Sequence, residues 1–190
     1  MFVFGSFIGI ISGYIGGLFD NIVMRIVDVF LAFPSLVLAI AVAGVLGGGM
    51  INAMIAIGVI GWTKYARLAR GEVLEIKEET FIKAARLSGN SSMYIVFKHI
   101  TPRVLSTLIV TASLDIGTTI MEMAALSFLG LSSPLPIPEW GAMMNEGKSM
   151  IQFAPWITIA PGIAIFIIVI LFNLLGDVVH DMLDPKQKEY

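Results

Sequence analysis

Two carboxylates lie in a long stretch of the sequence that is otherwise free of charge. Asp115 and Glu122 are the only charged residues between Val104 and Pro138. On a helix, a spacing of seven places both on one face, two turns apart. A carboxylate that faces lipid at mid-bilayer depth costs roughly 2.5 to 3.5 kcal/mol. If this stretch crosses a membrane, we expect both side chains to hydrogen-bond between helices or to line a watery path.

Two other strings have some features of catalytic motifs. AMMNEGKS nearly spells a phosphate-binding loop, but Ala142 replaces its first glycine and no strand is expected before it. Ser132 and Ser133 follow a glycine and a leucine, as the serine of an intramembrane protease does, but His99 and His180 are expected on the opposite side of a membrane. There is no cysteine, no HExxH and no cluster of histidines and carboxylates. The sequence therefore predicts neither an enzyme nor a metal site.

The composition indicates a membrane protein. Of the 190 residues, 57% are hydrophobic and only 14% are charged, whereas about a quarter of the residues of a soluble domain are charged. Lys, Arg, Asp and Glu are absent from residues 1–19, 29–63 and 149–176. About 20 apolar residues cross the hydrocarbon as a helix. The sequence predicts an all-α polytopic transmembrane bundle with five spans, near residues 2–18, 23–46, 51–71, 104–128 and 156–178.

The distribution of charge predicts the orientation. Eight of the twelve basic residues lie between Lys64 and Arg103, and the positive-inside rule places this segment in the cytoplasm. Counting spans outward from this segment places the loop at 130–155 and the N-terminus outside the cell. The C-terminal tail then lies in the cytoplasm. An outside N-terminus fits a chain that lacks one earlier span. Buried helices of a large soluble protein could also be apolar, but they would not explain this asymmetry.

Local signals predict the ends of several helices. Asp20 and Arg25 are expected in a short cytoplasmic turn, with Arg25 paired to Asp28 at the membrane edge. Pro34 should kink the second span, because proline removes a backbone hydrogen bond. The three glycines at 47–49 should form a tight turn after it.

The basic segment contains a loop, residues 76–102, that should fold locally. Thr80 can cap a short helix, and Gly89 can end it in the left-handed conformation. Ser91 or Ser92 can cap a second short helix, which Pro102 would end. The first helix could dock into a groove of a partner protein or lie on anionic lipid, and the residue types alone leave both open.

The order of residues in this loop resembles a known motif. FIKAARLSG, followed by ITP at 100–102, resembles the EAA loop of ATP-binding-cassette importer permeases. The resemblance implies a coupling helix that inserts into a cleft of a separate ATPase subunit. Lys83 stands where the family has its namesake glutamate, so the charge contact with the ATPase should differ. The implied coupling residues are Lys83, Ala84, Ala85, Arg86, Leu87 and Gly89.

Further strings extend the resemblance over nearly the whole chain. They are SGYIGGLFDNIVMRIVDVFLAFPSL, GWTKYARLARGEVL, EMAALSFLGLS, EWGAMMNEGK and FNLLGDVVHDMLDP. In this order and spacing they are similar to the C-type subunit of dipeptide, oligopeptide and nickel permeases. The resemblance implies one MetI-like permease domain over residues 1–190, in the cell membrane of a bacterium or archaeon.

The same resemblance implies partners and a substrate class. The partners are a homologous B-type permease subunit, two ATP-binding subunits that hold ATP and magnesium, and an extracytoplasmic binding protein; no nucleic acid is expected. The chain itself would bind no cofactor, and Asp115 and Glu122 would line the translocation path. Di- and oligopeptides are the expected substrates, with nickel or other small solutes as the alternative.

Two rival functions remain for comparison. A secondary transporter that runs without ATP often shows inverted repeats and charged residues in several spans, but no repeat is visible here and one span holds the central carboxylates. A membrane enzyme would need a convergent catalytic set, which the sequence does not show.

Overall fold

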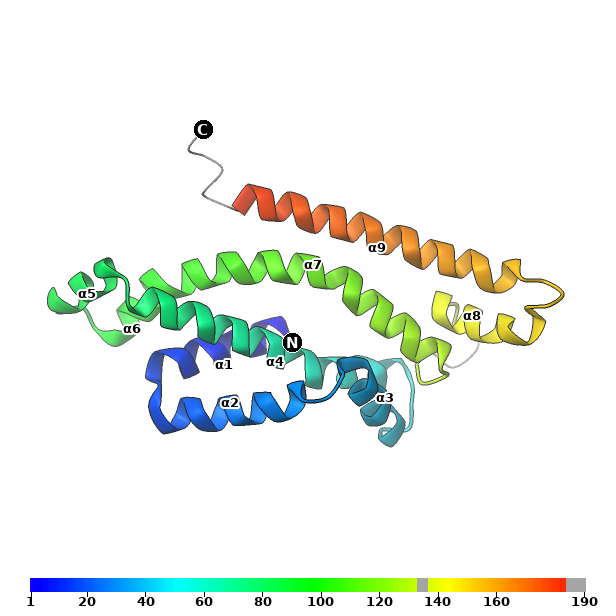
Figure 1. Ribbon diagram of the computed structural model, residues 1–190, viewed down its shortest axis with the longest axis horizontal. Coiled ribbons are helices and arrows are strands. Elements are labelled where there is room, and N and C mark those ends of the chain that lie inside the picture. The colour runs from blue at the N-terminus through cyan, green and yellow to red at the C-terminus, as the bar shows by residue number, and fades with distance from the viewer. Residues whose placement is uncertain (133–136, 184–190) are drawn as a thin grey trace. The chain divides into compact units, whose positions relative to one another are not determined.

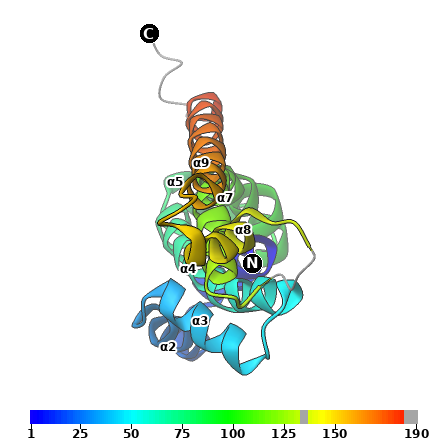
Figure 2. The same cartoon turned by 90° about the vertical axis from the view of Figure 1, so that its right-hand side faces the viewer.

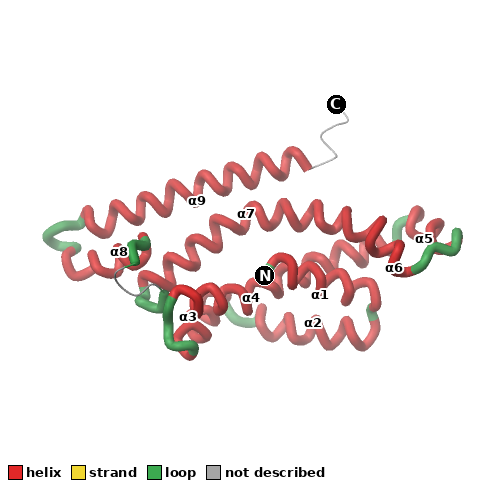
Figure 3. Tube along the Cα trace, turned by 180° about the vertical axis from the view of Figure 1, so that it is seen from behind, coloured by secondary structure: helices red, strands yellow, loops and turns green. Residues whose placement is uncertain are grey.

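The fold is known from a computed structural model, which describes residues 1–132 and 137–183. Every regular element in these two ranges is a helix, as predicted (Figures 1 and 3). The helices are α1 (Phe2–Ile15), α2 (Gly17–Leu31), α3 (Ser35–Val45), α4 (Met50–Lys77), α5 (Thr80–Leu87), α6 (Ser92–Ile95), the π-helix η1 (Val96–Ile100), α7 (Thr101–Phe128), α8 (Trp140–Gly147), the 3-10 helix η2 (Lys148–Met150) and α9 (Trp156–Leu183).

The predicted count of five spans is not confirmed. Among the described residues, two helices are long and apolar enough to cross a membrane, Ser92–Phe128 and Trp156–Met182. Helices α2 and α3 would make a third span if this bent pair crosses as one. Helix α1 is apolar but only 14 residues long. Helix α4 has 28 residues, but Lys64, Arg67 and Arg70 interrupt its apolar surface.

The second predicted span, residues 23–46, is wrong as a single kinked helix. Pro34 is extended, with φ −57° and ψ 127°, and the helices on its two sides are bent by 89°. Proline disfavours helical geometry in the residue before it and donates no hydrogen bond, so the chain breaks here completely. The preceding turn also lies earlier than predicted, at Gly16 and Gly17, so Asp20 and Arg25 lie within α2.

The described residues form two compact units. The first comprises Met1–Phe33 and Gly61–Ile109, and in it α1 packs closely on α4. Gly5 and Gly9 approach α4 so closely that an added Cβ would lie 2.3 Å from the carbonyl oxygens of Trp62 and Ala66. Glycine at every fourth position lets two helix backbones touch in this way.

The second unit comprises Pro34–Ile60 and the chain from Val110 onward. Here α8 packs along α9 (Figure 2). Gly141 of α8 lies against α7, with an added Cβ 2.4 Å from the carbonyl oxygen of Ala124. The predicted glycine turn is confirmed, because residues 47–49 all have positive φ.

Candidate functional site

The loop between α4 and α7 begins with the short helix α5, whose C-terminus ends as predicted. Gly89 has φ +80°, and its amide donates to the carbonyl oxygen of Arg86 at 3.0 Å. The amide and side chain of Asn90 both donate to the Ala85 carbonyl, at 3.3 and 3.0 Å. These bonds satisfy carbonyls that a helix end leaves without partners. At the other end the prediction is wrong, since the N-cap residue is Glu79 and not Thr80.

The second short helix is capped as predicted but does not end at Pro102. Ser91 Oγ accepts a hydrogen bond of 3.3 Å from the Tyr94 amide. The helix then continues through the π turn Val96–Ile100 into α7. In a regular α-helix, a proline ring clashes with the carbonyl four residues before it. The extra residue in a π turn shifts the preceding carbonyls, so this clash is avoided. Pro102 is therefore accommodated in the first turn of α7.

The loop is anchored to α7 by a mixed polar and aromatic cluster. Arg103 Nη1 donates to both carboxylate oxygens of Glu79, at 2.9 and 2.8 Å. Its guanidinium lies 4.5 Å from the ring centroid of Phe81. The ring of His99 meets Phe81 and Tyr94 edge-on, at 6.1 and 5.7 Å between centroids. Both ends of the loop are thereby joined. Ile82 of α5 is fully buried.

The loop exposes large apolar side chains. Leu87, Met93 and Phe97 are 90%, 69% and 63% exposed, and together we call them the tip surface. Helix α5 also exposes Lys83 and Ala84. Sequence reasoning singled out Leu87 but missed Met93 and Phe97, although their spacing of four on one helical stretch could have indicated a shared face.

The unusual lysine of the motif has a partner within the loop. Lys83 Nζ lies 3.0 Å from a carboxylate oxygen of Glu78. This hydrogen bond, together with the nearby positive charge, lowers the pKa of the Glu78 carboxyl. Both side chains are largely exposed, so the pair adds little to stability. The ion pair places the Glu78 carboxylate beside position 83, where the EAA motif carries a glutamate.

The two carboxylates of α7 lie on one continuous helix in the second unit. Glu122 Oε1 accepts a hydrogen bond of 3.0 Å from Ser35 Oγ, at the first residue of α3. The N-terminus of a helix favours a negative charge, so this position stabilises the carboxylate. Asp115 is half-buried, and its carbonyl oxygen accepts from Thr119 Oγ1. The hydrogen bond between helices, one of the two expectations for these residues, is thus seen for Glu122.

One of the two apparent catalytic strings forms ordinary helical structure, and the other lies after the end of α7. AMMNEGKS lies in α8 and η2, and Lys148 Nζ lies 4.1 Å from the ring centroid of Phe128. Ser132 is buried, and Ser133 lies outside the described residues, as does the C-terminal end from residue 184. Among residues 1–132 and 137–183, no group of three His, Cys, Asp or Glu side chains could hold a metal ion.

The long apolar helices among the described residues are typical of a membrane protein. A family model described as "Binding-protein-dependent transport system inner membrane component" matches residues 5–189. The chain belongs to this family.

Individual relatives are similar over almost the whole chain. It is 45% identical over 186 residues to the dipeptide transport system permease protein DppC of Alkalihalophilus pseudofirmus, covering 98% of this chain and 61% of the relative. The glutathione transport system permease proteins GsiD of Pectobacterium atrosepticum and Escherichia coli O157:H7 are 46% and 47% identical, covering 97% and 98% of this chain and 61% and 64% of the relatives. The chain thus spans about three fifths of the length of these relatives.

Proposed function

We propose that the chain is the transport core of a permease subunit in an ATP-driven importer of peptides. The observation that carries this proposal is the anchored loop with its exposed tip surface, at the place where the KAARLSG string resembles the coupling motif of such permeases. A short helix with an exposed apolar face fits a groove on a partner. The relatives named for dipeptide and glutathione transport support peptides as the substrate class.

The proposed mechanism assigns the chain no chemistry of its own. Two separate subunits bind and hydrolyse ATP with magnesium, and each grips one coupling loop, in this chain the segment from Lys83 to Gly89. ATP binding draws the two loops together, and the rigid-body movement opens a path between this chain and a homologous B-type permease subunit on the other side. An extracytoplasmic binding protein delivers the substrate and selects it. Nickel or another small solute is the alternative cargo.

The proposal includes an orientation and a single functional domain. The loop at 76–102 and the C-terminus face the cytoplasm, since most basic residues lie in and around this loop. The whole chain, residues 1–190, then acts as one permease domain in the cell membrane, with the coupling loop as part of it.

Transport by purified components tests the function. The full-length protein, assembled with its partner subunits in vesicles, should take up a labelled dipeptide only when the cytoplasmic face has ATP and magnesium. The chain has no native cysteine, so Leu87→Cys gives a single label for orientation. In the chain assembled without its ATPase subunits, which would cover Leu87, a membrane-impermeant maleimide should modify it from the cytoplasmic face alone. Uptake that persists without ATP, or labelling from the outer face, would contradict the proposal.

The role of Glu122 in the path has its own prediction. Glutamine in its place can still accept the hydrogen bond from Ser35, but the negative charge is lost. If the carboxylate lines the path, uptake of a labelled dipeptide should fall about tenfold, the effect of losing one charged contact. The matched control, Ser35→Ala, removes the hydroxyl and keeps the charge. Unchanged uptake by Glu122→Gln, at equal amounts of assembled protein, would assign Glu122 to helix packing alone.

A further inference from the structure

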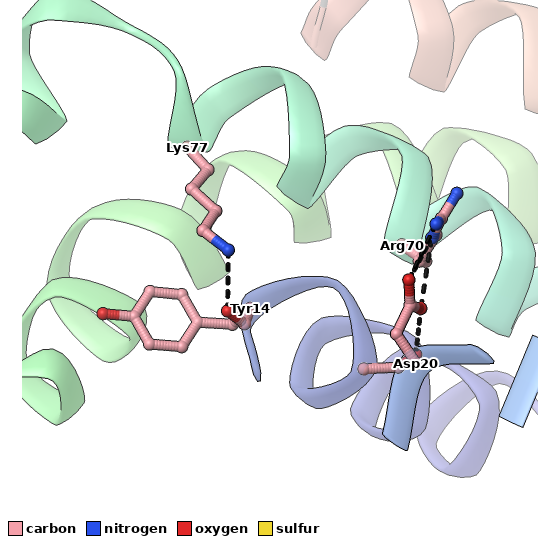
Figure 4. A network of polar contacts seen from close by, with 5 residues as sticks. Tyr14, Asp20, Arg70 and Lys77 are labelled. Carbon is pink, nitrogen blue, oxygen red and sulfur yellow. Dashed lines mark hydrogen bonds and ion pairs between the residues drawn. The ribbon is translucent and has the colours of Figure 1, made fainter. Parts of the chain in front are cut away.

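The most deeply buried charge among the described residues of the first unit is not in the loop. Asp20 is 5% exposed and lies in the first turn of α2. Its Oδ1 accepts a hydrogen bond of 2.6 Å from Ser12 Oγ of α1, and its Oδ2 accepts one of 2.7 Å from Arg70 Nη2 of α4 (Figure 4). A buried carboxylate persists only when it is paired in this way. One side chain thus joins three helices.

A second contact joins the same turn to the end of α4 and to α5. Lys77 Nζ donates a hydrogen bond of 2.9 Å to the carbonyl oxygen of Tyr14, near the C-terminus of α1 (Figure 4). The Tyr14 ring also lies 5.6 Å from Lys77 Nζ and 5.9 Å from the guanidinium carbon of Arg86 in α5. A lysine that bonds to the last carbonyls of a helix stabilises that end. Tyr14 therefore lies between α4 and the proposed coupling helix.

The backbone arrangement makes these contacts mechanically relevant. Lys77 is the last residue of α4, and only Glu78 and Glu79 separate it from α5. Helix α1 is held against α4 by the close glycine contacts described above. Two residues thus link α5 to Lys77, and Lys77 and Arg70 are both bonded to residues that flank the turn between α1 and α2.

We propose that the Asp20–Arg70 pair and the Tyr14–Lys77 contact form a brace that makes the α1–α2 turn move together with the coupling loop. This inference rests on the proposed function. The four residues are positioning residues, since the brace acts through helix contacts without touching ATP or cargo. Without the brace, the ATPase still binds the coupling loop. The movement of the loop then shifts α4 relative to the α1–α2 turn and does not reach that turn.

The test compares two carboxylate pairs that join the same two helices. Asp20→Asn weakens the buried pair, whereas Asp28→Asn weakens the pair with Arg67, whose side chains are 53% and 49% exposed. The full-length chain, assembled with its partner subunits in vesicles, is assayed for ATP hydrolysis and for uptake of a labelled dipeptide. For Asp20→Asn, we expect ATP hydrolysis within about twofold of the unmutated complex and dipeptide uptake per ATP lowered about tenfold. Asp28→Asn should leave this ratio unchanged.

The ratio separates the brace from a purely structural role. A static contact would lower hydrolysis and uptake together, in proportion to the amount of assembled complex, and would overturn the brace. Equal ratios for the two variants would overturn it as well. Asp20→Glu, which keeps the charge, should recover most of the uptake. If Asp20→Asn does not assemble, Lys77→Met provides the same test at the second contact, and an unchanged ratio there overturns the brace. Absence of ATP-dependent uptake in the unmutated complex contradicts the proposed function instead.

Discussion

Replacing Gly89 with valine should reduce uptake of a labelled dipeptide to less than about a tenth, while the chain still enters the membrane. Gly89 has φ +80°, where an L-residue costs roughly 1–2 kcal/mol and a β-branched one is a true outlier. The strained residue lies next to Asn90, whose amide and side chain both donate hydrogen bonds to the Ala85 carbonyl at the end of α5. The tip surface should then no longer match a preformed groove on the ATPase, so co-purification of the ATPase should weaken in parallel.

The control for this prediction keeps the backbone conformation. Asparagine tolerates the left-handed region better than any β-branched residue, so Gly89→Asn should retain most of the uptake and the bound ATPase. Membrane insertion is measured for both variants by labelling at Leu87→Cys. Equal uptake by the valine and asparagine variants would show that the left-handed turn is not needed for coupling.

Replacing Gly9 with leucine should lower the amount of folded protein in the membrane several-fold. An added Cβ at Gly9 would lie 2.3 Å from the Ala66 carbonyl oxygen and 2.7 Å from the Ala69 Cβ. Backbone and a short side chain cannot move aside, so α1 must move off α4. Overpacking of this kind costs about 1–3 kcal/mol, which changes cellular abundance several-fold. The measurement is the monodisperse fraction in detergent and its thermal midpoint.

The matched control lies at a helical glycine that nothing crowds. Gly44 in α3 has no heavy atom within 4 Å of an added Cβ. Gly44→Leu should therefore leave yield and thermal midpoint close to those of the unmutated chain. Similar losses at both positions would mean that α1 does not depend on close contact with α4.

The sequence was enough to predict an all-helical membrane protein and several of the helix ends. Long runs without charge predicted helices because lipid tolerates few charges. Gly89 and Ser91 predicted helix ends because their preferences act within four residues. The break at Pro34 was underestimated, since a proline indicates a kink but not its angle. Its size depends on what the two flanking helices pack against.

The contacts between distant residues could not be predicted. Periodicity indicates which face of a helix is polar, but it does not name the partner on another helix. Arg25 was paired with Asp28 because they are neighbours on one helix face, whereas Asp28 forms its ion pair with Arg67. The bond between Ser35 and Glu122 joins residues 87 positions apart. For the same reason, nothing in the sequence distinguished Asp20 as a buried carboxylate.

The π turn at Val96–Ile100 fixes the direction in which the tip surface points. Each residue of a helix turns the chain by about 100°, so deleting one residue here would restore a regular helix and swing everything before it sideways by about a quarter of a circle. Leu87 and Met93 would then point in another direction without any change in their own chemistry. On the proposed function, a one-residue difference in length at this point would thus change which surface the coupling loop presents to an ATPase.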